Sequence, residues 1–135
     1  MLARPRLLTL LVLLLASVAG HDARAAEFER YAYLLADQPG TATYPPNTLY
    51  ASQTVGSGAR ISRLAIGTYQ VRLLGFMAGR PAGGTVQVTS FNTPNFCNLA
   101  SWIASGSDLL VNVRCWRTSN QTAVDAAFTL MVAFG

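Results

Sequence analysis

Apolar and polar side chains alternate in short segments along most of the chain. In residues 68–74, Tyr69, Val71 and Leu73 share one parity, and a glutamine and an arginine lie between them. Comparable segments occur at residues 30–36, 49–54, 60–66, 85–91, 96–103 and 108–116. Alternation with a period of two predicts strands that bury one face, and the Gly- and Pro-containing stretches between them predict turns. We therefore expect seven or eight strands in an all-β fold, an antiparallel β-sandwich.

The final segment, residues 124–134, has apolar side chains on both parities. One row is apolar throughout, and the other contains Ala127, Met131 and Ala133. The β-branched and aromatic residues of this segment favour a strand over a helix. The pattern predicts a last strand that is buried on both faces.

Cys97 and Cys115, the two cysteines of the chain, lie on either side of a turn. The midpoint between them is Gly106, so a hairpin centred there places them directly opposite each other. Opposed residues of antiparallel strands have Cα atoms about 4.5–5.5 Å apart, a distance that a disulfide tolerates. The spacing predicts a Cys97–Cys115 disulfide, which the loop-entropy relation values at about 3 kcal/mol.

The first 25 residues have the pattern of a secretory signal peptide. Arg4 and Arg6 precede an apolar run at residues 7–19, and Ala23-Arg24-Ala25 follows as a small-x-small cleavage pattern. The run is shorter than the about 20 residues of a membrane-spanning helix. We expect cleavage after Ala25, which leaves residues 26–135 as one secreted or periplasmic domain with no membrane span. Export to an oxidising compartment agrees with the predicted disulfide.

Few side chains of this domain suit catalysis. Residues 26–135 contain neither histidine nor lysine, so the usual bases for a nucleophile are missing. Asp108 and Asp125 lie at turns, where carboxylates commonly have structural roles. We expect no catalytic residues and no enzymatic activity.

The same residues disfavour metals, cofactors and nucleic acid. Two thiols without histidine make a poor zinc site, and the chain has no carboxylate cluster or phosphate-binding loop. After cleavage, seven arginines outnumber five acidic residues, but they are scattered along the chain rather than clustered. We therefore expect no metal, no cofactor and no nucleic-acid partner.

The tyrosines and tryptophans have two interpretations. They could form a surface for stacking sugars or contacting a protein, although most are expected in the core or half-buried in strands. Trp116 follows Cys115 directly, so it should point away from the disulfide, on the same face as Arg114 and Asn112. These three residues are the predicted ligand-contact patch. Trp102 is expected on the face opposite to Cys97.

The segment from Gly67 onward has a recognisable pattern. It comprises Gly67-Thr68-Tyr69-Gln70-Val71, Gly83-Gly84-Thr85-Val86-Gln87-Val88-Thr89, Cys97, Trp102, Asp108, Val111-Asn112-Val113-Arg114-Cys115, and Asp125 with Phe128. This pattern resembles a family of small secreted bacterial β-rich domains of unknown function with one cysteine pair. The resemblance covers most of the chain from about Tyr31 and implies export, a disulfide and an all-β fold. It implies no catalytic or binding residues.

These features predict a non-enzymatic secreted protein with a role in surface or extracellular interaction. The first alternative is a carbohydrate-binding module that uses exposed Tyr and Trp rings. The second is a secreted inhibitor that inserts a loop such as Arg80-Pro81, within residues 79–84, into a target. The expected partner is an extracellular protein or a glycan.

Overall fold

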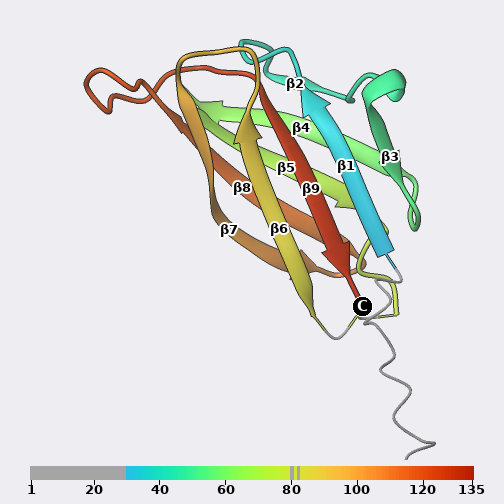
Figure 1. The fold of residues 1–135 in the computed structure, drawn as a ribbon. Helices are drawn as coiled ribbons and strands as arrows, with labels where there is room; N and C mark the ends of the chain where they lie inside the picture. The colour runs from blue at the N-terminus through green and yellow to red at the C-terminus, as the bar shows by residue number, and fades with distance from the viewer. Residues whose placement is uncertain (1–29, 80, 82) are drawn as a thin grey trace, which may run out of the picture.

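The computed structural model describes residues 30–79, 81 and 83–135. The predicted signal peptide at residues 1–25, and Arg80 in the loop considered for an inhibitor, lie outside the described residues. Nine strands are found within this part of the chain, and they form two antiparallel sheets (Figure 1). None of its helices has the length and apolar character needed to cross a bilayer.

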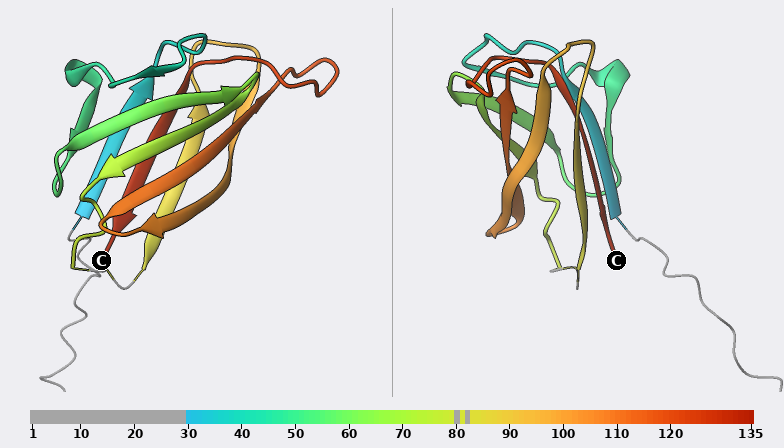
Figure 2. Two further views of the ribbon diagram at one scale, coloured as in Figure 1. Left: turned by 180° about the vertical axis from the view of Figure 1, so that it is seen from behind. Right: turned by 60° about the vertical axis from the view of Figure 1, so that its left-hand side comes forward.

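The two sheets lie against each other as the layers of a sandwich (Figure 2). Sheet A has the strand order β3-β1-β9-β6 and sheet B has the order β2-β4-β5-β8-β7. Sheet A contains β1 (Arg30–Ala36), β3 (Ala51–Gln53), β6 (Gly84–Ser90) and β9 (Phe128–Phe134). Sheet B contains β2 (Thr43–Tyr44), β4 (Gly58–Ala65), β5 (Thr68–Leu74), β7 (Phe96–Ser105) and β8 (Asp108–Trp116). The all-β sandwich with a disulfide is confirmed.

Most strands lie where the alternation places them. The bounds of β1, β5 and β8 match the predicted segments. The weak segment at residues 49–54 instead begins in the 3-10 turn η1 (Thr48–Tyr50), and only its middle forms β3. Asn47 caps that turn, because its Oδ1 accepts a hydrogen bond from the Leu49 N–H at 3.0 Å.

The core lies between the sheets and is built from the inward row of each strand. Val71, Val111 and Val132 are fully buried at its centre. At one end, the rings of Tyr69 and Phe128 pack with centroids 5.3 Å apart. This burial supplies the main favourable contribution to folding.

The last strand differs from its prediction. β9 begins at Phe128 rather than at residue 124, because the preceding residues bond to sheet B. The Val124 N–H donates to the Cys115 carbonyl of β8 at 3.2 Å, and the Ala126 N–H donates to the Tyr69 hydroxyl of β5 at 3.2 Å. The expectation that both faces are buried holds at Ala133 of the outer row but fails at Met131. Met131 lies on the outer face of sheet A and is 54% exposed, because no described element packs over it.

The β7–β8 hairpin brings the cysteines together as predicted. Cys97 and Cys115 are directly opposed and bonded, with Cα atoms 4.0 Å apart. Both are buried. The disulfide therefore joins the two strands at the edge of the core.

A β-bulge, rather than the turn alone, sets this register. The turn pairs Ser105 with Asp108, and an uninterrupted ladder from there would place Cys97 opposite Trp116. The register shifts between Leu99 and Ser101, which brings Cys97 opposite Cys115.

The same bulge reverses the predicted orientation of Trp102. Trp102 pairs with the buried Val111, on the same inward face as Cys97. Its ring packs edge-on against Phe134 with centroids 5.2 Å apart. The extra residue in β7 therefore turns this side chain toward the core.

Candidate interaction surfaces

The outer face of sheet A is an uncharged surface rich in tyrosine. Cross-strand pairing of β1, β9 and β6 sets three rows of outward side chains. These rows are Tyr31–Ala133–Thr85, Tyr33–Met131–Gln87 and Leu35–Thr129–Thr89. We call this surface, together with Leu49 and Tyr50 of η1, the tyrosine face.

Large side chains of the tyrosine face are open to solvent. Tyr33 is 48% exposed, Tyr50 is 53% exposed and Leu49 is 80% exposed. By contrast, Tyr44 and Tyr69 are buried. Single exposed apolar residues are ordinary, but a contiguous group of them marks an interaction site more often than a plain surface.

The turn η1 gives the tyrosine face one raised side. It lies on the side of sheet A that faces away from sheet B (Figure 2). Leu49 and Tyr50 on this side, and Gln87 and Thr89 of β6 on the other, line a groove of about 380 Å³. Tyr33 lies between them, so the groove crosses the sheet.

The outer face of sheet B has a different composition. A row of hydroxyl and amide side chains crosses all five of its strands. In spatial order, the row is Thr43, Ser62, Gln70, Asn112 and Ser101. We call this surface the ladder face.

The predicted patch of Asn112, Arg114 and Trp116 lies on the ladder face. The three residues line a shallow hollow of about 560 Å³ over β8. Asn112 is bonded on both sides, since its Oδ1 accepts from Gln70 at 3.2 Å and its Nδ2 donates to Ser101 at 2.9 Å. The structure thus brings the three together, with the Asn112 amide already engaged within the sheet.

The two faces also differ in charge. Arg60, Arg72 and Arg114 lie on outward positions of sheet B, and Arg72 Nε is 2.6 Å from the Asp108 carboxylate. The three outward rows of sheet A contain neither an arginine nor a carboxylate. An anion would be attracted to the ladder face, whereas the tyrosine face suits an uncharged surface.

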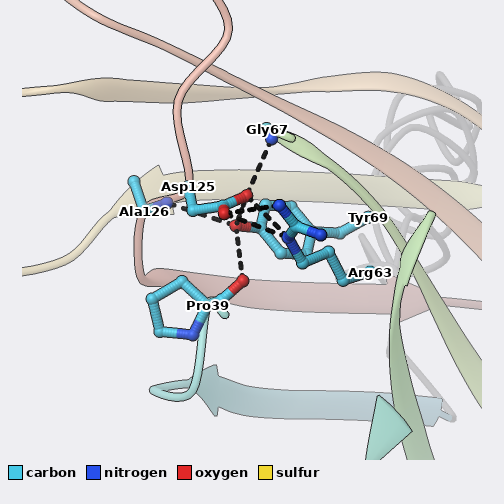
Figure 3. A network of polar contacts seen from close by, with 6 residues as sticks. All are labelled: Pro39, Arg63, Gly67, Tyr69, Asp125 and Ala126. Carbon is cyan, nitrogen blue, oxygen red and sulfur yellow. Dashed lines mark hydrogen bonds and ion pairs between the residues drawn. The ribbon is translucent and has the colours of Figure 1, made fainter. Parts of the chain in front are cut away.

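Asp125 is the centre of a polar network at one end of the sandwich (Figure 3). Arg63 Nη2 lies 2.8 Å from its carboxylate, and the Gly67 N–H donates to Oδ1 at 2.9 Å. The Tyr69 hydroxyl shares its hydrogen between Asp125 Oδ1 and the Pro39 carbonyl, both at 3.1 Å. It also accepts from the Ala126 N–H at 3.2 Å.

This network shifts the titration of its members. The Arg63 guanidinium and the Gly67 N–H hold the pKa of Asp125 below its usual range, although partial burial opposes them. Burial raises the pKa of the Tyr69 hydroxyl, and the neighbouring carboxylate raises it further. Asp125 is therefore ionised and fully bonded at neutral pH, so it is a poor proton acceptor.

Asp108 is engaged in a similar way. Its Oδ1 accepts from the Gly75 N–H at 2.8 Å and its Oδ2 accepts from Arg72. These contacts lower the pKa of its carboxyl group, the Gly75 N–H first and Arg72 second. Within residues 30–79, 81 and 83–135, no three His, Cys, Asp or Glu side chains gather as metal ligands do.

The sequence pattern does not predict the tyrosine face as one surface. The alternating pair Tyr31 and Tyr33 is the signal that the sequence offers. The outer row of the last strand has the apolar pattern of a core row, so the sequence predicts that Met131 is buried. Pairing between β1 and β9, which are about 100 positions apart, is what joins these residues.

The chain was also compared with family models, with curated proteins and with solved structures, and none of them matches it. No residue role is carried over from a relative. The exposure, charge and hydrogen bonding of the two outer faces are therefore the observations that bear on the function of the domain.

Proposed function

We propose that the chain is a secreted, non-enzymatic binding domain that contacts an uncharged apolar patch of a partner protein through its tyrosine face. The observation that supports this most is the exposure of Tyr33, Tyr50 and Met131 on a surface without charge. Centres of protein interfaces are enriched in Tyr and Met and depleted of Asp, Glu and Lys. The tyrosine face has that composition.

Two features support the secreted part of the proposal. Residues 1–25 have the order of a signal peptide. The Cys97–Cys115 disulfide is the form expected in an oxidising compartment.

The contacts of the carboxylates support the non-enzymatic part. Asp108 and Asp125 are bonded to arginines and to backbone N–H groups of the fold. General base catalysis needs a group whose pKa lies near the working pH, and both of these pKa values are lowered instead.

A neutral glycan is the second candidate partner. Thr85, Gln87 and Thr89 form an exposed polar strip on β6, on the side of the groove opposite Tyr50. A sugar ring has apolar and hydroxyl-bearing sides, so a groove with rings on one side and amide and hydroxyl groups on the other suits it.

Photocrosslinking tests the proposal even though the partner is unidentified. The benzophenone amino acid p-benzoylphenylalanine replaces Gln87 on the tyrosine face or, as the matched control, Arg114 on the ladder face. The protein is exported in the cells that produce it, irradiated, and its adducts are identified by mass spectrometry. We expect a protein adduct from position 87 and none from position 114.

A glycan array run with the purified, oxidised protein separates the two candidates. Glycan binding that is lost in Met131→Arg, without a protein adduct, would replace the protein partner with a carbohydrate. Adducts from position 114 alone would transfer the site to the ladder face. The absence of both adducts and glycan binding would contradict a binding role for the tyrosine face.

A further inference from the structure

β3 and β4 lie on the same side of the sandwich, one in each sheet (Figure 1). Residues of both strands line a crevice there. Its volume is about 400 Å³ and its lining is mainly apolar. Pockets for small ligands measure about 300–1,000 Å³ and have a similar lining. The crevice adjoins the groove of the tyrosine face, because Tyr33 and Leu34 line both.

Small side chains at two inward positions create the crevice. Ala51 of β3 pairs with Leu34, and Ala59 of β4 pairs with Leu73. The leucines are buried at its floor, while the alanines at the edges are only partly buried. Larger residues at the alanine positions would fill the space between the sheets.

Hydrogen bonds, close backbone packing and prolines fix the two ends of the crevice. At one end, Gln53 Nε2 donates to the carbonyls of Val55 and Leu74, at 2.8 and 3.1 Å. Gly56 there comes so close to β5 that an added Cβ would lie 1.9 Å from the Leu74 carbonyl oxygen. Pro45 and Pro46 line the other end. The space is therefore formed before any ligand enters, which lowers the entropy cost of binding.

The mouth of the crevice carries a positive charge. Arg60 is an exposed lining residue; its position in β4, opposite Arg72, faces outward from sheet B, so its charge lies at the rim of the crevice rather than between the sheets. No carboxylate among the described residues forms an ion pair with it. β4 pairs with β2 only at Ile61 and Ser62, so Arg60 lies where the edge of sheet B is uncovered. An anionic group at the mouth would meet a cation that forms no ion pair among the described residues.

We infer that this crevice binds a single-chain amphiphile, with its aliphatic chain against Leu34 and Leu73 and an anionic head at Arg60. Saturated fatty acids represent this class. The volume suits one chain rather than a two-chain lipid. The proposed site shares Tyr33 and Leu34 with the lining of the groove on the tyrosine face, whereas Met131 lines only that groove.

Calorimetric titration of the purified protein with octanoate, decanoate and dodecanoate tests the inference, at concentrations below micelle formation. Each buried methylene should strengthen binding about fourfold until the crevice is full. Dodecanol should bind at least fivefold more weakly than dodecanoate. Dodecyltrimethylammonium, which places a cation at the mouth, should bind more weakly still.

Three variants locate the binding. Ala59→Phe fills the crevice from its edge and should abolish binding, and Ala51→Phe does the same from the other sheet. Arg60→Gln should weaken dodecanoate binding and leave dodecanol binding unchanged. Met131→Arg, on the tyrosine face, is the matched control and should bind dodecanoate as the natural protein does.

The melting temperature of each variant identifies any that fails to fold, and the two alanine variants act as substitutes for each other. No binding by the natural protein would overturn the inference. Binding retained in both folded alanine variants would also overturn it, as would loss in Met131→Arg. Equal affinities for dodecyltrimethylammonium and dodecanoate would contradict the role of Arg60.

Discussion

The two outer faces of the sandwich use their polar and aromatic side chains in opposite ways. On the ladder face, Gln70, Asn112 and Ser101 bond to one another across strands. On the tyrosine face, Tyr33 and Met131 are half exposed. The ladder face and the Asp125 network contribute to the stability of the fold, whereas the tyrosine face remains available to a partner. Substitutions in the first region should therefore change stability, and substitutions in the second should change binding.

The largest expected loss of stability is at Gly67, beside the Asp125 network. Its φ is +65°, and an added Cβ would lie 2.5 Å from the Cys115 carbonyl oxygen. Gly67→Ala should lower the free energy of unfolding by about 3 kcal/mol or more, through backbone strain and the clash. Gly106→Ala is the control, because Gly106 has a φ of +61° with nothing within 4 Å. It should cost only about 1 kcal/mol, and equal losses in urea denaturation would contradict the packing at Gly67.

Tyr69→Phe should have the next largest effect. The change removes one hydroxyl and leaves the Ala126 N–H and the Pro39 carbonyl without this partner. Unpaired buried groups of this kind cost about 1–3 kcal/mol. Tyr31→Phe on the tyrosine face is the matched control and should change the unfolding free energy by less than about 0.5 kcal/mol. A destabilised Tyr31→Phe would remove the contrast between the two regions.

Acid should destabilise the protein through the same network. The pKa of Asp125 is lowered in the folded state, so the unfolded chain takes up its proton first as the pH falls below about 4. The stabilisation is complete above that pH and is lost as the pH falls through the folded pKa. Melting temperatures measured from pH 6 to pH 2 should drop less steeply for Asp125→Asn than for the natural protein. Parallel curves would show that this carboxylate is not coupled to folding.

A smaller effect is expected within the ladder itself. Asn112→Ala removes the contacts to Gln70 and Ser101 and should cost about 1 kcal/mol, the usual value of a partly exposed hydrogen-bonded pair. Gln87→Ala on the tyrosine face should cost almost nothing, since Gln87 is exposed. Partner binding should be weakened by Gln87→Ala and left unchanged by Asn112→Ala. A stable Asn112→Ala protein that loses its partner would place the site on the ladder face.

The sequence predicts the sandwich well because alternation reports which residues of a strand share a face. It predicts the disulfide correctly, but it does not reveal the bulge at Ala100 that sets the register. A one-residue insertion into a ladder leaves little trace in side-chain type, and this is why the alternation predicts the wrong face for Trp102.

The tyrosine face is harder to predict than the fold. An apolar row such as that of β9 has the same pattern whether a second layer covers it or a partner does. Only the sheet order, which joins Tyr33 to Met131 and Met131 to Gln87, shows that the row lies outside.

The most direct test of binding through the tyrosine face compares one substitution on each outer face and measures both crosslinking and the melting temperature. Met131→Arg adds one positive charge at the centre of the tyrosine face. Arg114→Gln removes one positive charge from the ladder face. The yield of protein adduct from the benzophenone at position 87 is measured in both backgrounds, together with the melting temperature. We predict at least a tenfold loss of adduct in Met131→Arg at an unchanged melting temperature, and no loss in Arg114→Gln. An adduct that persists in Met131→Arg, or disappears in Arg114→Gln, would contradict binding through this face.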